Sequence, residues 1–137
     1  MLCHPPCEGI DEWRQIYMRV ARTNGGEPEA GRHLVSWLLA AQLPLSSIEY
    51  GATAVVYAPG DEPWRTNWGR AWADRLLHSS LHDQAIAYGV ASHEELVRLA
   101  DAWKAWAASP SSLSYYVNGE ALVRVPCCHP HATRETE

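Results

Sequence analysis

Three tryptophans recur at intervals of four residues in the middle of the chain, at Trp64, Trp68 and Trp72. This spacing places them along one face of a helix, where aromatic rings could line a pocket for a flat or cationic small molecule. Arg75 and His78 lie further along the same helix and could orient such a ligand. The alternatives are ordinary ones: a tryptophan stripe that packs a helix onto a core, and an arginine that pairs with an acid in solvent. The candidate substrate-binding residues are Trp64, Trp68, Trp72, Arg75 and His78.

Histidine and cysteine residues raise the question of a metal site. His78 and His82 are four residues apart, close to metal-ligand spacing on a helix, and Asp83 follows directly, but a third ligand and a glutamate base are missing. The two ends of the chain carry further groups that could form one zinc site if the ends met, namely Cys3, His4, Cys7, Cys127, Cys128, His129 and His131. Their spacings are not those of standard zinc motifs. We predict no metal site.

Other titratable groups have structural explanations. Tyr57, Tyr88 and Tyr115 could transfer protons, but nothing in the sequence places them near a substrate. Acidic pairs such as Asp61-Glu62 and Glu94-Glu95 fall at predicted helix starts, where the helix dipole and capping account for them. The catalytic residues therefore stay unknown.

Composition limits the class of protein. The chain has 137 residues, 47% of them hydrophobic and 20% charged, with a formal net charge of −5. This is globular composition for one domain, and the lack of a basic cluster argues against nucleic acid as a partner. No apolar run approaches the roughly 20 residues that span a bilayer, and the start resembles no secretion signal. We expect a cytoplasmic protein with reduced thiols, not bound to a membrane.

Hydrophobic periodicity predicts the helices that would position these residues. One helix runs from Ile10 to the Asn24-Gly25-Gly26 stop, and a second lies between Pro28 and Pro44. Three more follow as an insertion: one from about Asp61 to Ser79 with the tryptophan stripe, a short one to Gly89, and one that starts at the capping box of Ser92 to Glu95 and stops at Pro110.

Alternation predicts a strand on each side of this insertion, at about 46–58 and 113–125. If the second strand is unbroken, its apolar residues, including Tyr115 and Val117, lie on one face and its polar residues lie on the other. A hairpin turn at Asn118-Gly119 would mix the two faces, so we favour the unbroken strand, with Gly119 as a candidate bulge. Two strands do not make a stable sheet in water, so one edge is left bare and further sheet is expected.

Short segments spread along the chain carry a family resemblance. They include Gly9-Ile10-Asp11-Glu12-Trp13, Asn24-Gly25-Gly26-Glu27-Pro28-Glu29-Ala30-Gly31-Arg32, Trp72-Ala73-Asp74-Arg75 and Gly119-Glu120-Ala121-Leu122-Val123-Arg124-Val125. In this order they resemble the C-terminal portion of class I S-adenosylmethionine-dependent methyltransferases of the ubiquinone/menaquinone-biosynthesis type. The resemblance covers residues 10–125. Residues 1–9 are expected to be an irregular N-terminal segment, and residues 126–137 a loose tail.

The resemblance implies an α+β fragment of an α/β doubly wound methyltransferase fold. The fragment would be mostly helical, with a terminal antiparallel strand pair and a three-helix insertion that caps the pocket for a small-molecule methyl acceptor. Such enzymes hold S-adenosylmethionine with a glycine-rich turn after the first strand. No such turn occurs in this chain, because Gly25-Gly26 follows a helix. No cofactor is therefore expected for this chain alone, and no residue is assigned to cofactor binding.

Two functions from different classes follow. The first is the substrate-side half of a methyltransferase, which is inactive alone because the cofactor-binding half is absent. The second is a non-enzymatic interaction module or subunit, which pairs through its strand edge and a tryptophan-rich surface. Its partner would be a second copy of the chain or a separate cofactor-binding chain.

Overall fold

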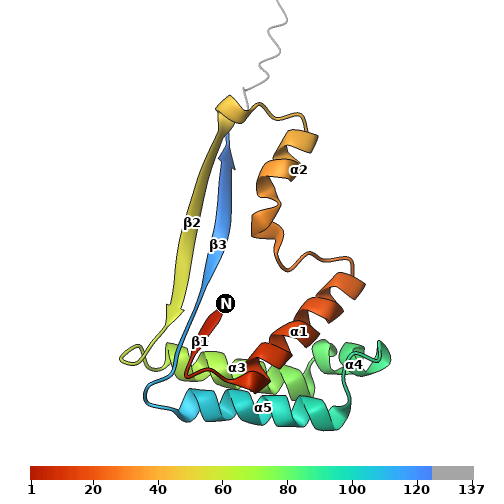
Figure 1. The fold of residues 1–137 in the computed structure, drawn as a ribbon, viewed down its shortest axis with the longest axis vertical. Coiled ribbons are helices and arrows are strands. Elements are labelled where there is room, and N and C mark those ends of the chain that lie inside the picture. Colours follow the sequence, from red (N-terminus) through yellow and green to blue (C-terminus); the bar gives the residue numbers. More distant parts are fainter. Residues whose placement is uncertain (125–137) are drawn as a thin grey trace, which may run out of the picture.

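The fold is α+β, with five helices and a three-stranded antiparallel sheet. The computed structural model describes residues 1–124 (Figure 1). The elements, in chain order, are β1 (Leu2–His4), α1 (Glu8–Thr23), the 3₁₀ turn η1 (Ala30–Arg32), α2 (Leu34–Ala40), the 3₁₀ turn η2 (Leu45–Ser47), β2 (Ile48–Tyr57), α3 (Trp64–His78), α4 (Ser80–Ala87), α5 (His93–Ala108) and β3 (Leu113–Val123). The three-helix insertion between two long strands is thus confirmed.

The two predicted strands form the antiparallel pair β2–β3. Their register is regular from Ile48 opposite Val123 to Tyr57 opposite Ser114. Ala52 lies opposite Gly119 within this regular run, so β3 passes through Asn118-Gly119 without a turn. The unbroken strand is confirmed, and the bulge considered at Gly119 is absent.

The sheet has a third strand that the sequence did not predict. Residues 1–9 were expected to be irregular, but β1 pairs antiparallel with β3, with Leu2 opposite Tyr115 and His4 opposite Leu113. The helix α1 also begins inside this segment, at Glu8. That expectation was therefore wrong: three residues are too few to show a period of two, and the prolines that follow mark only where the strand ends.

The second predicted helix is shorter than expected. Between Pro28 and Pro44 the chain forms only η1 and the seven-residue α2. A close backbone contact interrupts the helix: a Cβ atom placed on Gly31 would lie 3.1 Å from the backbone nitrogen of Gly119. The turn η1 thus lies directly against β3, and only glycine at both positions allows this approach.

The hydrophobic core lies among α1, α3 and α5. Buried side chains from these helices include Ile10, Trp13, Trp72, Leu76, Leu99 and Trp103. The helices α3 and α5 approach closely at Gly69, where an added Cβ would lie 2.7 Å from the Cβ of Ala107. The predicted capping box is present at the start of α5, with Ser92 accepting from the Glu95 backbone and the Glu95 carboxylate accepting in return.

The strands β2 and β3 rise from this helical layer as an arm, with α1 and α2 on the β3 side (Figure 1). One face of the arm is apolar along its length and largely open to solvent, since Tyr50, Val56 and Val117 are 49%, 49% and 61% exposed. Within residues 1–124, β2 has no strand partner on its outer side. A bare edge is therefore present in the described part of the chain, as predicted.

None of the helices in the described residues has the length and apolar character needed to cross a membrane.

Candidate functional site

A cleft of about 940 Å³ opens between the first helix, the turn η1, the helix α3 and the strand β3. One group of lining residues is aromatic: Trp13, Tyr17, Trp68, Trp72, Tyr115 and Tyr116. A second group is charged and lies near η1: Arg14, Glu29 and Arg32. The volume is within the usual range for a small-molecule site.

Five of the six aromatic rings of the cleft, all but that of Tyr115, form one continuous wall. Trp68 stacks on Tyr57, with ring centroids 4.5 Å apart, and lies 6.0 Å from Tyr116. Trp72 meets Trp68 and Trp13 edge to face, at 5.6 and 4.4 Å. The wall therefore joins the sheet, α3 and α1, and its members hold one another in orientation.

The polar atoms of the tryptophans in this wall are buried. The indole nitrogens of Trp13, Trp68 and Trp72 are buried and have no hydrogen-bond partner among the described residues. Buried indole N–H groups usually find an acceptor. What the cleft offers a ligand along this wall is thus mainly apolar surface.

The predicted tryptophan stripe divides between two environments. Trp68 and Trp72 line the cleft, and Trp72 also belongs to the core. Trp64 is 65% exposed and lies outside the cleft lining. The reason is geometric: residues four apart on a helix rotate by about 40° at each step, so a stripe drifts off one face, and Trp64 begins the helix.

Arg75 lies beside the wall. Its guanidinium carbon is 4.9 Å from the centroid of the Trp72 ring, a cation–π contact. Among residues 1–124 it makes no salt bridge, so the expected pairing with an acid is not what the structure has. Arg75 supports Trp72 from outside the cleft.

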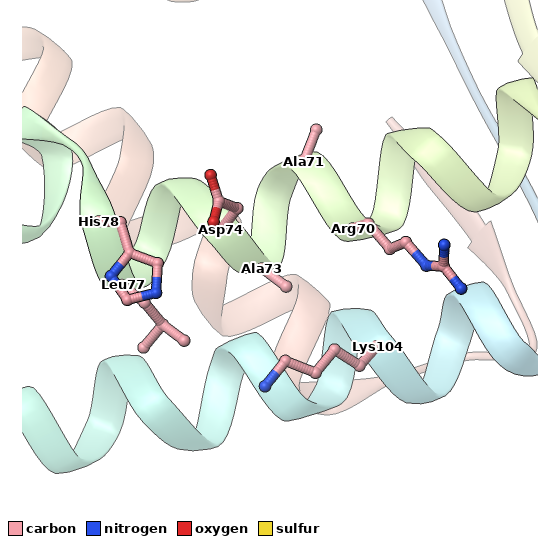
Figure 2. A pocket seen from close by; sticks show the side chains of 7 residues that line it. All are labelled: Arg70, Ala71, Ala73, Asp74, Leu77, His78 and Lys104. Atoms are coloured by element: carbon pink, nitrogen blue, oxygen red, sulfur yellow. The ribbon is translucent and has the colours of Figure 1, made fainter.

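His78 lies in a different place. It lines a second hollow of about 590 Å³ between α3 and α5. Figure 2 shows this hollow with Arg70, Asp74 and His78 on α3 and Lys104 on α5. The five candidate substrate-binding residues are therefore not all brought together: two line the cleft, one stacks behind it, and Trp64 and His78 are elsewhere.

Of the two helical histidines considered for a metal site, His82 makes hydrogen bonds to other side chains. His82 contacts Asp83 through Nδ1 at 2.9 Å and His93 through Nε2 at 3.0 Å. No group of three or more His, Cys, Asp or Glu side chains within residues 1–124 is placed to hold a metal ion. Cys3 and Cys7 are free thiols, and the cluster Cys127, Cys128, His129 and His131 lies outside the described residues.

Electrostatics disfavour Tyr57 as a general base. Burial, together with the neighbouring Tyr116, raises the pKa of Tyr57 to about 12. Its phenol therefore stays neutral at physiological pH. Since Tyr57 stacks on Trp68, we read it as a packing residue of the wall.

Sequence reasoning missed several residues of the cleft. Trp13 and Tyr17 are four apart on α1, and Tyr116 lies on the polar parity of β3. The first two were recognised only as the apolar face of a helix, a pattern that does not distinguish a core from a cleft. Arg14 and Arg32 carried no signal, because isolated arginines at these positions are typical of any surface.

Comparison of the chain with protein-family models, with curated proteins and with solved structures found no match.

Proposed function

We propose that residues 10–125 form the acceptor side of an S-adenosylmethionine-dependent methyltransferase, and that the aromatic cleft binds the methyl acceptor. The observation that carries the proposal is the position of the cleft. Two of the six aromatic residues that line it, Trp68 and Trp72, come from α3, the first helix of the insertion, and the family resemblance assigns this insertion to the acceptor pocket.

The order of the strands supports the proposal. In the family resembled, the last two strands of a doubly wound sheet form an antiparallel pair. The pair β2–β3, with three helices between its strands, has this arrangement. The short β1 adds a third strand on the other side of β3, where β3 is unpaired beyond Tyr115 within the described residues. More sheet could join at this edge.

The lining of the cleft favours binding and orientation over acid–base chemistry. Among residues 1–124, Glu29 is the one carboxylate that lines it, and Arg22 and Arg32 approach this carboxylate at 2.9 and 3.3 Å. These two ion pairs occupy both oxygens of the carboxylate. The chain would therefore hold a flat acceptor against Trp68 and Trp72 and exclude water from it.

The residues of this chain do not fit the methyl donor. The family's donor site needs a glycine-rich turn between a strand and a helix. Within the described residues, Gly25 follows α1 and precedes η1, so it lies between helical segments. The donor site would be supplied by another polypeptide segment, and we derive no step of the transfer from this chain.

Calorimetry with S-adenosylmethionine tests this function. We expect no binding to the 137-residue chain. We also expect a strand, a glycine-rich loop and a helix to be encoded in the DNA upstream of Met1 or to be present in a separate subunit. Joined to that segment, the chain should bind S-adenosylmethionine at micromolar concentration. Micromolar binding by the chain alone, or a joined protein that binds none, would contradict the proposal.

The exposed apolar face of the arm favours a second candidate, an interaction module. Tyr50, Val56 and Val117 form part of a surface that a monomer normally covers, and β2 adds an unpaired edge. Size-exclusion chromatography with light scattering separates the candidates. Self-association that is lost on Tyr50→Lys, a position outside the cleft lining, would support the module, and a clean monomer would count against it.

A further inference from the structure

The rim of the aromatic cleft carries more positive than negative charge. Arg14 and Arg32 line the cleft on either side of Glu29, with guanidinium nitrogens 4.0 and 3.3 Å from the same carboxylate oxygen. Arg22 takes the other oxygen of Glu29 at 2.9 Å and also pairs with Glu27 at 3.2 Å. Three guanidinium groups thus share two carboxylates.

The two arginines that line the cleft keep free donors. The Arg14 side chain is 41% exposed, and its 4.0 Å separation from Glu29 is too long for a hydrogen bond. The Arg32 side chain is 76% exposed and forms one ion pair with Glu29, at 3.3 Å. A guanidinium has five N–H donors, so both side chains can turn toward an incoming anion at little cost.

The wall next to this rim selects a flat apolar body. Trp13 and Tyr17 stack with their planes 19° apart, and both line the cleft directly beside Arg14 on the same helix. Trp68 and Trp72 continue the wall from α3. A ring that lies on these faces would place a substituent at the η1 rim.

We propose that the cleft binds a planar aromatic compound that carries a carboxylate. The ring lies against Trp68 and Trp72, and the carboxylate is paired by Arg14 and Arg32, because guanidinium and carboxylate groups match in a two-bonded geometry. The inference rests on the proposed function, since it names the class of acceptor, and it concerns binding by this chain alone.

A cation is the opposite possibility, since aromatic walls also bind quaternary ammonium groups. The charges on the rim disfavour it. Glu29, the one carboxylate of the described residues that lines the cleft, is already approached by three arginines. The net positive charge of these arginines would repel a cationic ligand, whereas it attracts an anionic one.

Binding of three naphthalene probes to the full chain tests the charge preference. Calorimetry and saturation-transfer NMR would compare 2-naphthoate, neutral 2-naphthamide and 2-naphthyltrimethylammonium. We expect 2-naphthoate to bind at least about tenfold more tightly than 2-naphthamide, the usual effect of a charged hydrogen bond, and the cation to bind most weakly. Tightest binding of the cation, equal affinity for acid and amide, or no binding of any probe would overturn the inference.

Variants locate the site. In the Arg14→Gln/Arg32→Gln double variant the acid should bind no better than the amide, while the amide keeps its affinity. Arg19→Gln is the matched control, because Arg19 is exposed on α1 and does not line the cleft. Trp68→Ala should weaken both probes, whereas Trp64→Ala, on the exposed first turn of the same helix, should weaken neither. If the double variant still bound the acid more tightly than the amide, Arg14 and Arg32 would not be the residues that pair the carboxylate.

The result is separable from the test of the proposed function. A chain that binds 2-naphthoate as described, but gains no S-adenosylmethionine binding when joined to a donor segment, retains the ligand class and refutes the methyltransferase. If the chain fused to the donor segment binds S-adenosylmethionine, but the chain alone does not bind 2-naphthoate, only the proposed class of ligand is refuted.

Discussion

The most densely bonded side chain in the structure is a buried arginine outside the cleft. Arg65 is 5% exposed. Its guanidinium donates to the backbone carbonyls of Ala107 and Ser109 at 3.2 and 2.7 Å, and to the Ser112 hydroxyl and the Glu62 carboxylate. It thereby ties the start of α3 to the end of α5 and to the turn before β3.

Replacement of this arginine should strongly destabilise the fold. Arg65→Met removes the side-chain donor to the Ala107 carbonyl, to Ser112 and to Glu62, and leaves the Ser109 carbonyl only its bonds from Ser112. It should lower the free energy of unfolding by about 3 kcal/mol. Arg70→Met, on the exposed side of the same helix, should change it by less than about 0.5 kcal/mol. Urea unfolding followed by circular dichroism measures both. Equal stability of the two variants would show that Arg65 is dispensable.

The carboxyl group of Glu62 makes the stability depend on pH. Hydrogen bonds from Thr66, and then from Arg65, lower its pKa below the ordinary value of 4.5. The folded carboxyl group therefore holds its proton less firmly than the unfolded one. The stability that this gives is present above pH 4.5 and is lost as the pH falls through the lowered folded pKa.

The variant Glu62→Gln should accordingly be less stable than the natural chain at neutral pH, with a difference that shrinks below pH 4.5. Thr66→Val, which removes the first cause of the shift, should reduce the pH dependence while keeping the carboxyl group. Urea midpoints measured from pH 7 to pH 3 give the comparison. A difference that stays constant across this range would contradict the assignment.

At the scale of single residues, sequence patterns predicted the tryptophan stripe but not its division. The interval of four residues fixed the helix, yet only the placement of α3 against β3 decides that Trp68 enters the cleft while Trp64 lies in solvent. The roles of Arg65 and of Arg14 and Arg32 depend on partners far apart in the chain or on another turn. The spacing of residues along a short segment does not indicate such distant partners.

At the scale of elements, the contact between α3 and α5 depends on a missing side chain. A Cβ on Gly69 would lie 2.7 Å from the Cβ of Ala107 and 3.0 Å from the Trp103 carbonyl oxygen. Alanine favours a helix by up to about 1 kcal/mol over glycine, but overpacking costs about 1–3 kcal/mol. We expect the second effect to win.

Gly69→Ala should therefore lower the thermal midpoint, as measured by differential scanning calorimetry. Gly51→Ala is the control, since a Cβ there meets nothing nearer than 3.6 Å and should leave the midpoint nearly unchanged. A Gly69→Ala protein that is more stable than the natural chain would mean that the two helices can separate without cost.

The elements themselves were largely predictable. Hydrophobic periodicity, together with glycine, proline and capping residues at the element ends, predicted α1, α3, α4, α5 and both long strands. The capping box at Ser92 gave the best-defined boundary. They failed at β1, which is too short to show a pattern, and between Pro28 and Pro44, where the contact of Gly31 with Gly119 shortens the helix. Both failures involve β3, a strand more than eighty residues away in the chain.

At the scale of the whole molecule, the helical layer and the strand arm differ in how much apolar surface they bury. The buried core residues lie mainly on α1, α3 and α5, whereas residues 49–54 of β2 are exposed on both faces. Local stability follows buried contacts. The arm should therefore open more readily than the helices.

Hydrogen–deuterium exchange read by mass spectrometry checks this difference. Peptides from 48–54 and 117–123 should exchange well before peptides from 96–107. The pairing of β1 with β3 should give Leu113–Tyr115 intermediate protection. Uniform protection across the molecule would indicate that the arm is covered in solution, which would favour the interaction module.

The crowding of indole rings in the helical layer has a spectroscopic consequence. Trp13, Trp68, Trp72, Trp103 and Trp106 form a chain of ring contacts with centroids 4.4 to 6.3 Å apart, while Trp37 and Trp64 are exposed. Chromophores this close couple their transitions, so the near-ultraviolet dichroism should be intense and should come almost entirely from the layer. During thermal unfolding, loss of the near-ultraviolet signal would report unfolding of the helical layer alone. The far-ultraviolet signal would show whether the strands β2 and β3 had already unfolded.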